Sequence, residues 1–213
     1  MKNYKFLLAF SWIGSLLFFL AAMVFGFLTT NYSHIGQFIS ELGADNAPYN
    51  HLMNYLGIIP FGLSIILFSI GGFKVSIGKR LTKSAFVLLL IVGVLFVIAG
   101  FFNCDQGCSF EDMSQKSIIH NMSAFSAFIL SVAVQFLVGI NSFFKQKNKY
   151  YLYSFFAALL GMILFYIIGK AGIYSDYRGL YQRLFLLNFL IWLVVTGQNL
   201  IQQNYSSKTQ VKQ

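Results

Sequence analysis

Charge is scarce in this chain of 213 residues. Only 10% of the residues are charged, six of these are acidic, and 57% of the chain is hydrophobic, including 25 phenylalanines. A sequence with so little charge cannot cover a folded domain with a water-compatible surface. The composition therefore excludes a soluble globular protein and indicates one that lies in a membrane.

Proline and cysteine are also rare, with two of each. Few prolines and eighteen glycines suit helices that pack closely in lipid, where each backbone N–H and C=O group must be satisfied within its own segment. The predicted fold class is all-α. Residues 1–5 carry two lysines before a long apolar run without a clear small-x-small cleavage site, so we interpret this run as a retained first span.

Apolar windows of about twenty residues, the length that a helix needs to cross the hydrocarbon core, occur six times. They predict a polytopic membrane protein, a bundle of six transmembrane helices with short connections. We expect one transmembrane domain, 1–201, and a polar cytoplasmic tail, 202–213. The windows lie at about 7–29, 53–73, 84–103, 119–141, 151–171 and 183–201.

The positive charges predict the orientation, because Lys and Arg in short loops stay on the cytoplasmic side. Eleven of the fifteen basic residues fall on one side of the spans, whereas all six acids fall on the other. We therefore expect both termini in the cytoplasm of a cell whose plasma membrane, in bacteria the inner membrane, holds the protein. The net charge of +9 is then explained by topology and anionic headgroups, and nucleic acid is not an expected partner.

The cysteines, Cys104 and Cys108, lie on the predicted outer side, where a disulfide is permitted. Gly107 can take the positive φ that so tight a loop often needs. A bridge would aim Asp105 toward the bundle. The alternative is a free or purely structural cysteine pair.

The first outer segment, residues 31–51, is too polar to span the membrane, but its apolar residues fall on one helical face. We expect a short amphipathic or partly re-entrant helix from Ser33 to Leu42, with Gly43 as its C-terminal cap. Such a helix would hold Ser40 and Glu41 near the membrane surface. The alternative is an interfacial helix whose polar residues are merely solvated.

All three histidines, His34, His51 and His120, lie on the predicted outer side. Neutral imidazoles with a carboxylate such as Asp105 make the ligand set of a catalytic zinc that keeps one position for water. No pair has the i, i+4 spacing, so separate elements would have to assemble the site. His34 and His51 could instead be satisfied interfacial residues, whereas His120 begins a span, where an ionisable group is costly unless it is used.

A second arrangement uses Ser40 as nucleophile, His120 as base, and Asp105 or Glu41 as the orienting acid. The sequence has no G-x-S-x-G elbow to support it. We expect these four residues and Arg183 to converge in one outward-facing cavity, because ionisable groups at span ends are costly against lipid.

Two arginines precede or open the last span. Arg183 can bind a carboxylate or a lipid phosphate through two parallel hydrogen bonds. Arg178 is a second candidate for substrate binding, and its alternative is to extend toward the headgroups.

Four short segments occur in the order Ser40-Glu41-Leu42-Gly43, Cys104-Asp105, His120 and Gly179 to Arg183. Together they resemble the six-span family catalogued as Domain of Unknown Function 998, over nearly the whole chain. The resemblance implies the architecture and a shared polar site, without an established activity. Asn103 stands where that family is expected to have proline.

A more distant similarity links the chain to membrane-embedded metal-dependent hydrolases of the alkaline-ceramidase and progestin-receptor type. It rests only on a Ser/Asp/His set within a helical bundle, and those proteins have more spans and a paired-histidine motif that is absent here.

Three functions remain open at this point. The first is an outward-facing hydrolase or transferase that acts on a lipid or lipid-linked substrate. The second is a non-catalytic binding or assembly protein whose charged cluster is structural. The third, transport, is disfavoured because mid-span polarity is limited to amides and hydroxyls, with no buried charge to mark a path.

Overall fold

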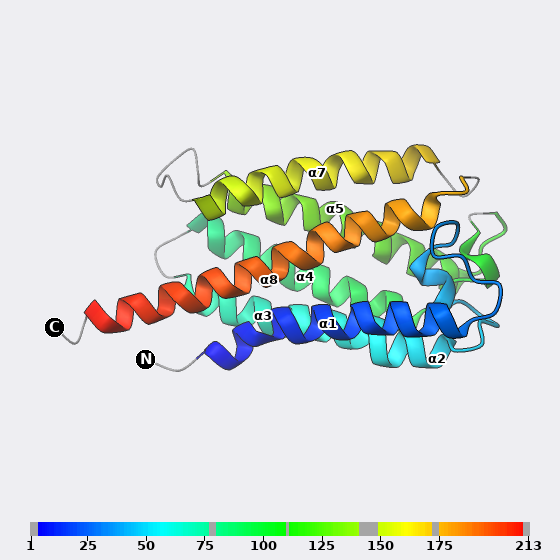
Figure 1. Ribbon diagram of the computed structural model, residues 1–213, viewed down its shortest axis with the longest axis horizontal. Helices are drawn as coiled ribbons and strands as arrows, with labels where there is room; N and C mark the ends of the chain where they lie inside the picture. The colour runs from blue at the N-terminus through cyan, green and yellow to red at the C-terminus, as the bar shows by residue number, and fades with distance from the viewer. Residues whose placement is uncertain (1–3, 77–79, 110, 141–148, 172–174, 211–213) are drawn as a thin grey trace.

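The computed structural model describes residues 4–76, 80–109, 111–140, 149–171 and 175–210. Within those ranges all long elements are α-helices and no strand occurs. Six helices are long and apolar enough to cross a membrane. They run side by side as an elongated bundle (Figure 1), so the all-α class and the six spans predicted from the sequence are confirmed.

The second span contains a local irregularity. It begins with the short turn α2, Asn50–Leu52, passes through a π-helical segment η2, Met53–Ile58, and continues as α3, Ile59–Val75. Pro60 lies in the first turn of α3 and has no N–H to donate to the preceding turn, which accounts for the wider winding just before it. The other spans are α1, Lys5–Leu28; α4, Arg80–Phe101; α5, Gln115–Gly139; α7, Lys149–Ala171; and α8, Arg178–Gln210.

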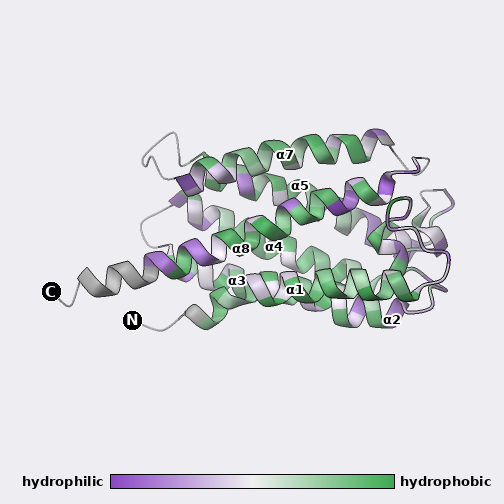
Figure 2. Cartoon of the chain, viewed as in Figure 1, coloured by the Kyte–Doolittle hydropathy of each residue, from purple (hydrophilic) through white to green (hydrophobic). Residues whose placement is uncertain are grey.

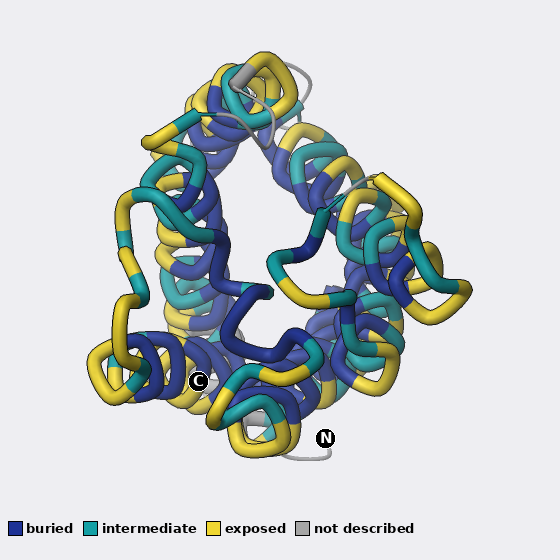
Figure 3. Tube along the Cα trace, turned by 90° about the vertical axis from the view of Figure 1, so that its right-hand side faces the viewer, coloured by how far each residue is buried: buried dark blue, intermediate teal, exposed yellow. Residues whose placement is uncertain are grey.

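The spans form a closed ring in chain order. Each one packs against the next, and α8 packs back against α1; Figure 3 shows this ring from one end. Small residues allow close approach between neighbours. A Cβ on Gly62 of α3 or on Gly93 of α4 would lie only 2.7 or 2.8 Å from the other residue's carbonyl oxygen, so neither position has room for a side chain.

Aromatic rings join the helices inside the ring. Phe18 of α1 stacks on Phe61 of α3 with centroids 4.8 Å apart, and Phe61 contacts Phe96 of α4 edge-on at 4.9 Å. Phe128 of α5 continues toward α8, where its centroid lies 4.7 Å from that of Phe185. Such pairs add specific contacts to the burial of apolar area. The helices consist of hydrophobic residues along most of their length (Figure 2), and many of their large apolar side chains are exposed, as expected where they face lipid tails.

Both termini lie at one end of the bundle (Figure 1). The connections 29–49 and 102–114, together with the helix ends beside them, lie at the other, which we call the mouth. The side of the membrane that the mouth faces stays a prediction. Some basic residues behind that prediction lie outside the described residues: Lys2, Lys79, Lys145, Lys147 and Lys212. α8 continues through Gln210, into the polar tail expected from residue 202.

Candidate functional site

The first connection at the mouth folds as a turn followed by a short helix. The helix expected over Ser33–Leu42 forms only in its second half, as the 3-10 helix η1, Ile39–Gly43. Polar side chains explain the difference. The Ser33 N–H donates to Gln37 Oε1 at 2.8 Å, and the Gly36 N–H donates to Ser33 Oγ at 3.0 Å. These local bonds hold the backbone in a turn and compete with helix formation.

η1 is largely buried against the rest of the protein. Ile39 is 5% exposed and Leu42 is 1% exposed, and the helix ends on Ala44 as its C-cap, one residue beyond the expected Gly43. Figure 3 shows this buried stretch folding inward across the end of the ring. Ser40, which follows Ile39, therefore lies across the end of the helical ring.

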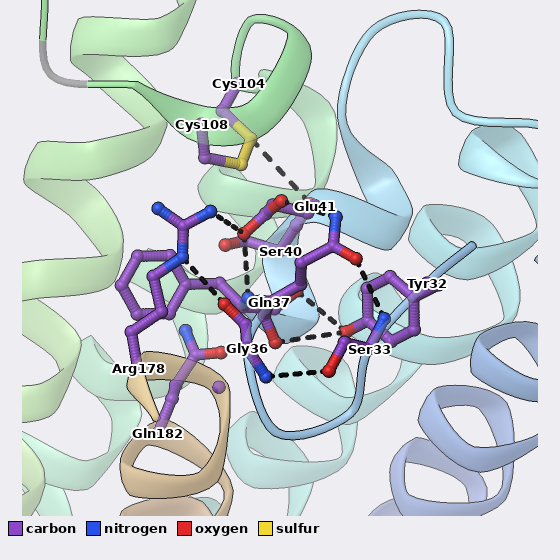
Figure 4. A network of polar contacts seen from close by, with 12 residues as sticks. Tyr32, Ser33, Gly36, Gln37, Ser40, Glu41, Cys104, Cys108, Arg178 and Gln182 are labelled. Carbon is purple, nitrogen blue, oxygen red and sulfur yellow. Dashed lines mark hydrogen bonds and ion pairs between the residues drawn. A yellow bond between two sulfur atoms is a disulfide. The ribbon is translucent and has the colours of Figure 1, made fainter. Parts of the chain in front are cut away.

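The start of α8 holds this connection from the far end of the chain. The Ile39 N–H donates to Gln182 Oε1 at 2.6 Å across 143 positions of sequence. The Arg178 Nε–H donates to the Gly36 carbonyl at 2.9 Å. Figure 4 shows the bond from Arg178 to Gly36 and the polar contacts around it. We call this set of contacts between the first connection and residues 178–183 the clamp.

Arg183 and Gly179 complete the clamp. Arg183 donates to the carbonyl of Gln37 at 2.8 Å and to the hydroxyl of Tyr32 at 2.6 Å. A Cβ on Gly179 would lie 2.1 Å from the Gln37 carbonyl oxygen, so the approach requires glycine there. The predicted substrate-binding Arg183 is thus engaged by the protein itself.

Glu41 and Arg178 form a largely buried ion pair in the clamp. Arg178 Nη2 lies 3.2 Å from Glu41 Oε1, with side chains 19% and 5% exposed. Glu41 Oε1 also accepts the Phe38 N–H at 2.8 Å, and Oε2 accepts an amide hydrogen of Gln37 at 3.0 Å. The Arg178 guanidinium lies over the Phe38 ring at 5.2 Å. Both charged groups therefore bind the connection that carries Ser40.

Two titratable rings lie beside the clamp. Burial raises the pKa of Tyr32 to about 12 even though the adjacent Arg183 opposes the shift. The ring of His34 packs against Phe27 at 4.8 Å and Tyr32 at 5.4 Å. Burial, and secondarily the positive charge of Arg183, lower the pKa of His34. His34 is thus a neutral ring packed on aromatic neighbours.

Cys104 and Cys108 are bridged, with Cα atoms 5.1 Å apart, as the sequence predicted. Gly107 within the loop has φ of 76°, the left-handed value for which glycine is suited. Both cysteines are buried. Cys104 Sγ lies 3.7 Å from the Ser40 carbonyl oxygen (Figure 4), and the Cys104 carbonyl accepts the Asp45 N–H at 2.9 Å. The disulfide loop therefore supports η1 from the side opposite α8.

Asn103 also joins the two connections. Asn54 donates to the Gly43 carbonyl at 2.9 Å and to Asn103 Oδ1 at 3.1 Å. Asn103 in turn donates to Asp45, at 3.4 Å. A proline at position 103 could make neither side-chain contact, so this departure from the expected family pattern has a structural role here.

The side chain of Asp105 binds the residues at the start of α5. Its carboxylate accepts the Ser114 N–H at 2.8 Å and the Ser114 hydroxyl at 2.7 Å, and its own N–H donates to Ser117 Oγ. Ser114 is the N-cap of α5. These Ser114 bonds lower the pKa of Asp105, with Lys116 contributing less. No hydrogen bond joins Asp105 to His120 in the described part of the chain.

His120 is buried and is fixed by the end of α4. Its Nδ1 lies 2.7 Å from the Ala99 carbonyl oxygen and 2.9 Å from that of Phe102. Carbonyl oxygens only accept, so Nδ1 carries a proton, and in the neutral tautomer the lone pair lies on Nε2. In a triad a carboxylate usually orients the imidazole, whereas here two unpaired helix-end carbonyls do so.

His120 and Ser40 share a cavity of about 450 Å³ at the mouth. Gln182 lines it as well, and most of its wall is apolar, formed by residues such as Phe128 and Phe165. A smaller recess of about 40 Å³ lies against Ser40, His120 and Gln182. Among the described residues nothing hydrogen-bonds to the Ser40 hydroxyl. The cavity therefore offers a serine hydroxyl and an imidazole next to an apolar space.

The predicted convergence is partial. Ser40 and His120 line one cavity, Glu41 lies beneath it in the clamp, and Asp105 caps α5 instead. Arg183 borders a different groove of about 110 Å³ between α1 and α8.

The residues of the predicted zinc set are dispersed. His34 packs on aromatic rings, and His51 stacks on Tyr55 at 6.4 Å. His120 and Asp105 bind the separate partners described above. Among the residues that the structure describes, no three His, Cys, Asp or Glu side chains are grouped to hold a metal ion. The ligand set expected from the sequence does not fit a zinc centre in this geometry.

Gln182 is the site residue that sequence reasoning missed. An amide at the start of a span has no chemical signature of its own. The available signal was its position, because Gln182 lies four residues after Arg178 and therefore on the same face of the helix.

Six apolar helices around an aromatic interior, with polar connections gathered at one end, define a multi-pass membrane protein. Within that class, the family model described as "Protein of unknown function (DUF998)" matches residues 12–199. The chain belongs to this family, as the resemblance seen in the sequence implied. Comparisons with curated proteins and with solved structures gave no match.

Proposed function

We propose that this protein is a membrane enzyme, a hydrolase or transferase that moves an acyl group from a lipid or lipid-linked substrate. Ser40 is the nucleophile and His120 is its general base. One observation carries the proposal: two carbonyls hold Nδ1–H of a buried histidine, leaving Nε2 as its basic atom, and that histidine shares a cavity with an unbonded serine hydroxyl.

The proposed reaction requires the Ser40 hydroxyl and the His120 imidazole to come within hydrogen-bonding distance of each other. A serine hydroxyl is a weak nucleophile until a base removes its proton as it attacks. No hydrogen bond joins Ser40 to His120 among the described contacts, and such bonds commonly shorten only when substrate is bound. The clamp and the disulfide loop hold η1, and with it Ser40, at the cavity that His120 also lines.

The walls of the cavity favour a lipid. Phe125 of α5 is 52% exposed yet lines the cavity, and so does the exposed Gly169 of α7. The cavity therefore reaches the surface of the bundle between α5 and α7, at the outer end of the spans. A lipid can enter from the side, with its chain against apolar wall and its polar group toward Ser40.

The charged residues are assigned supporting roles. Glu41, Arg178 and Arg183 fasten the first connection to α8, and Asp105 fastens the disulfide loop to α5. This bonding also supports the alternative, a non-catalytic binding or assembly protein whose charges are structural. Substitutions of the neutral pair, Ser40 and His120, distinguish the two proposals.

We also propose that the mouth faces outward from a plasma membrane, in bacteria the inner membrane. This orientation is supported by the basic residues near the other end and by the bridged cysteines at the mouth.

A fluorescent long-chain alkyl fluorophosphonate tests the enzyme proposal on the full chain in detergent. We expect the probe to label the natural protein and to leave Ser40→Ala unlabelled. His120→Asn retains an N–H near the position of Nδ1 but lacks the base, so labelling should slow by about 10²–10⁴-fold.

Ser84→Ala is the matched control, because Ser84 is exposed near the opposite end of α4. It should label as the natural protein does. If the natural protein is not labelled, or if Ser40→Ala is labelled equally well, the serine mechanism is wrong and the binding alternative is favoured.

A further inference from the structure

Gln182 is held in one orientation by its contact with η1. A backbone N–H can only donate, so the atom 2.6 Å from the Ile39 nitrogen must be the carboxamide oxygen, Oε1. The NH₂ group then occupies the other branch of the carboxamide. Gln182 is buried and lines both the large cavity and the small recess. In the described part of the chain its NH₂ group donates no hydrogen bond.

The cavity and the recess share three polar lining residues. Ser40, His120 and Gln182 line both spaces. The recess, at about 40 Å³, is small but exceeds the roughly 10–15 Å³ that one water molecule requires. An oxygen atom bonded to a carbon beside Ser40 fits a space of that size, next to a fixed amide donor.

We propose that the Gln182 NH₂ group is the oxyanion donor of this site, and that the substrate is a neutral carboxylic ester with a long alkyl chain. This inference rests on the proposed function and specifies its substrate class. An amide held by a backbone N–H needs no reorientation when negative charge develops on the substrate oxygen, which is the condition for effective stabilisation.

The charges of the residues around the cavity favour a neutral ester over a phosphodiester as the substrate. Of the described residues that line the large cavity, Glu111 is acidic and none is Lys or Arg. The nearby Arg178 pairs with Glu41, and Arg183 binds Tyr32 and a carbonyl. A phosphate would bring negative charge into an apolar space without a cation to bind it. A carboxylic ester is uncharged until the reaction places charge on its carbonyl oxygen.

The reaction is balanced with water as the only co-reactant. Ser40 Oγ bonds to the ester carbonyl carbon while His120 Nε2 takes the hydroxyl proton, and Gln182 binds the oxyanion. The carbon–oxygen bond to the alcohol breaks as His120 returns the proton to the leaving alcohol. Water then attacks the acyl-serine by the same steps, releasing a fatty acid and restoring Ser40.

The test uses p-nitrophenyl palmitate and butyrate, with bis(p-nitrophenyl) phosphate as the charged comparison, and the full chain in detergent. Gln182→Glu is the decisive variant, because a carboxylate oxygen can still accept the Ile39 N–H while the donor is lost. We expect its kcat on palmitate to fall by about 10²–10³-fold. Its KM and Tm should stay close to those of the natural protein.

Two further variants keep the result interpretable. Gln182→Met removes the acceptor as well, so it should lower Tm in addition to kcat. Ala124 also lines both spaces, and Ala124→Leu should reduce the ratio of palmitate to butyrate turnover by narrowing the chain site.

The outcomes distinguish this inference from the function on which it rests. If Ser40→Ala abolishes ester turnover but Gln182→Glu leaves kcat unchanged, the oxyanion assignment is wrong and the serine mechanism stands. Ser40-dependent turnover of the phosphodiester at a rate equal to the ester would overturn the substrate class alone. Ester turnover that survives Ser40→Ala would overturn both.

Discussion

At the scale of single residues, Asp105 and Glu41 have roles separate from those of the neutral groups. The carboxylate of Asp105 binds the N-cap of α5, and that of Glu41 binds a backbone N–H and an arginine. The uncharged Ser40, His120 and Gln182 are left to line the cavity. In an apolar space this division is favourable, because an ionised group without a partner is costly there.

Asp105 makes a pH-dependent contribution to stability. Hydrogen bonds from Ser114 lower its pKa in the folded protein from an ordinary value of 3.8. A carboxyl with a depressed folded pKa stabilises the protein above the unfolded pKa, and this stabilisation is lost as pH falls through the folded pKa. We therefore expect Asp105→Asn to lower Tm at pH 7, by an amount that shrinks as the pH drops below about 4.

Thermal unfolding of the detergent-solubilised protein from pH 7 to pH 3 measures this difference. Asp112→Asn serves as the control, since Asp112 is exposed and its φ of 49° is one that asparagine tolerates. A Tm difference for Asp105→Asn that stays constant across the range would contradict the linkage.

At the scale of elements, the clamp between η1 and α8 is the contact that determines where η1 and Ser40 lie. It joins a 3-10 helix of five residues, too short to be stable alone, to the first turns of a long helix. Most of its bonds come from backbone groups of residues 35–39, so the position of Ser40 depends on side chains of α8.

We expect Arg178→Met to destabilise the protein far more than breaking an exposed pair. It leaves the carboxylate of Glu41, 5% exposed, without its cation, and such a loss costs about 3–5 kcal/mol. The bonds from Gln37 and Phe38 remain, which favours the lower end of that range. The matched control is Lys116→Met, which breaks an exposed pair with Asp45 and should change the free energy of unfolding by about 0–1 kcal/mol.

Denaturant unfolding compares the two variants, and Arg178→Met combined with Glu41→Gln should recover part of the loss by removing the stranded charge. Equal effects of Arg178→Met and Lys116→Met would show that the clamp does not rely on the ion pair.

The sequence predicted the spans well because each span has its own twenty-residue apolar signal. It also brought out Ser40 and His120, whose side chains are chemically distinctive. It did not reveal Gln182, because a contact across 143 positions depends on which helices become neighbours. The helix expected over Ser33–Leu42 was too long for a related reason: its apolar period was correct, but side chains of Ser33 and Gln37 occupy the backbone groups of its first half.

At the scale of the whole molecule, the ring closes only where α8 meets α1. The even number of spans puts both termini at one end (Figure 1), and the distribution of basic residues predicts that this end is cytoplasmic. The outward mouth and the proposed substrate of the outer leaflet both depend on that orientation.

A fluorescent protein that matures only in the cytoplasm, fused after Gln213, checks the orientation. We expect the fusion to fluoresce. A periplasm-active phosphatase at the same position should be inactive, and the opposite pattern would place the mouth, with its proposed site, inside the cell.

The ribosome synthesises the first connection before α8. The clamp between them can therefore form only after α8 has been made. The ribosome completes Ser40 early, but the amide that holds the neighbouring Ile39 is added 143 residues later. Until the last span enters the bilayer, η1 lacks the clamp that fixes Ser40 at the cavity shared with His120. Under the proposed function, a nascent or truncated chain would carry Ser40 and His120 in an inert form, and the surrounding lipids would meet an assembled site only once the last span is in place.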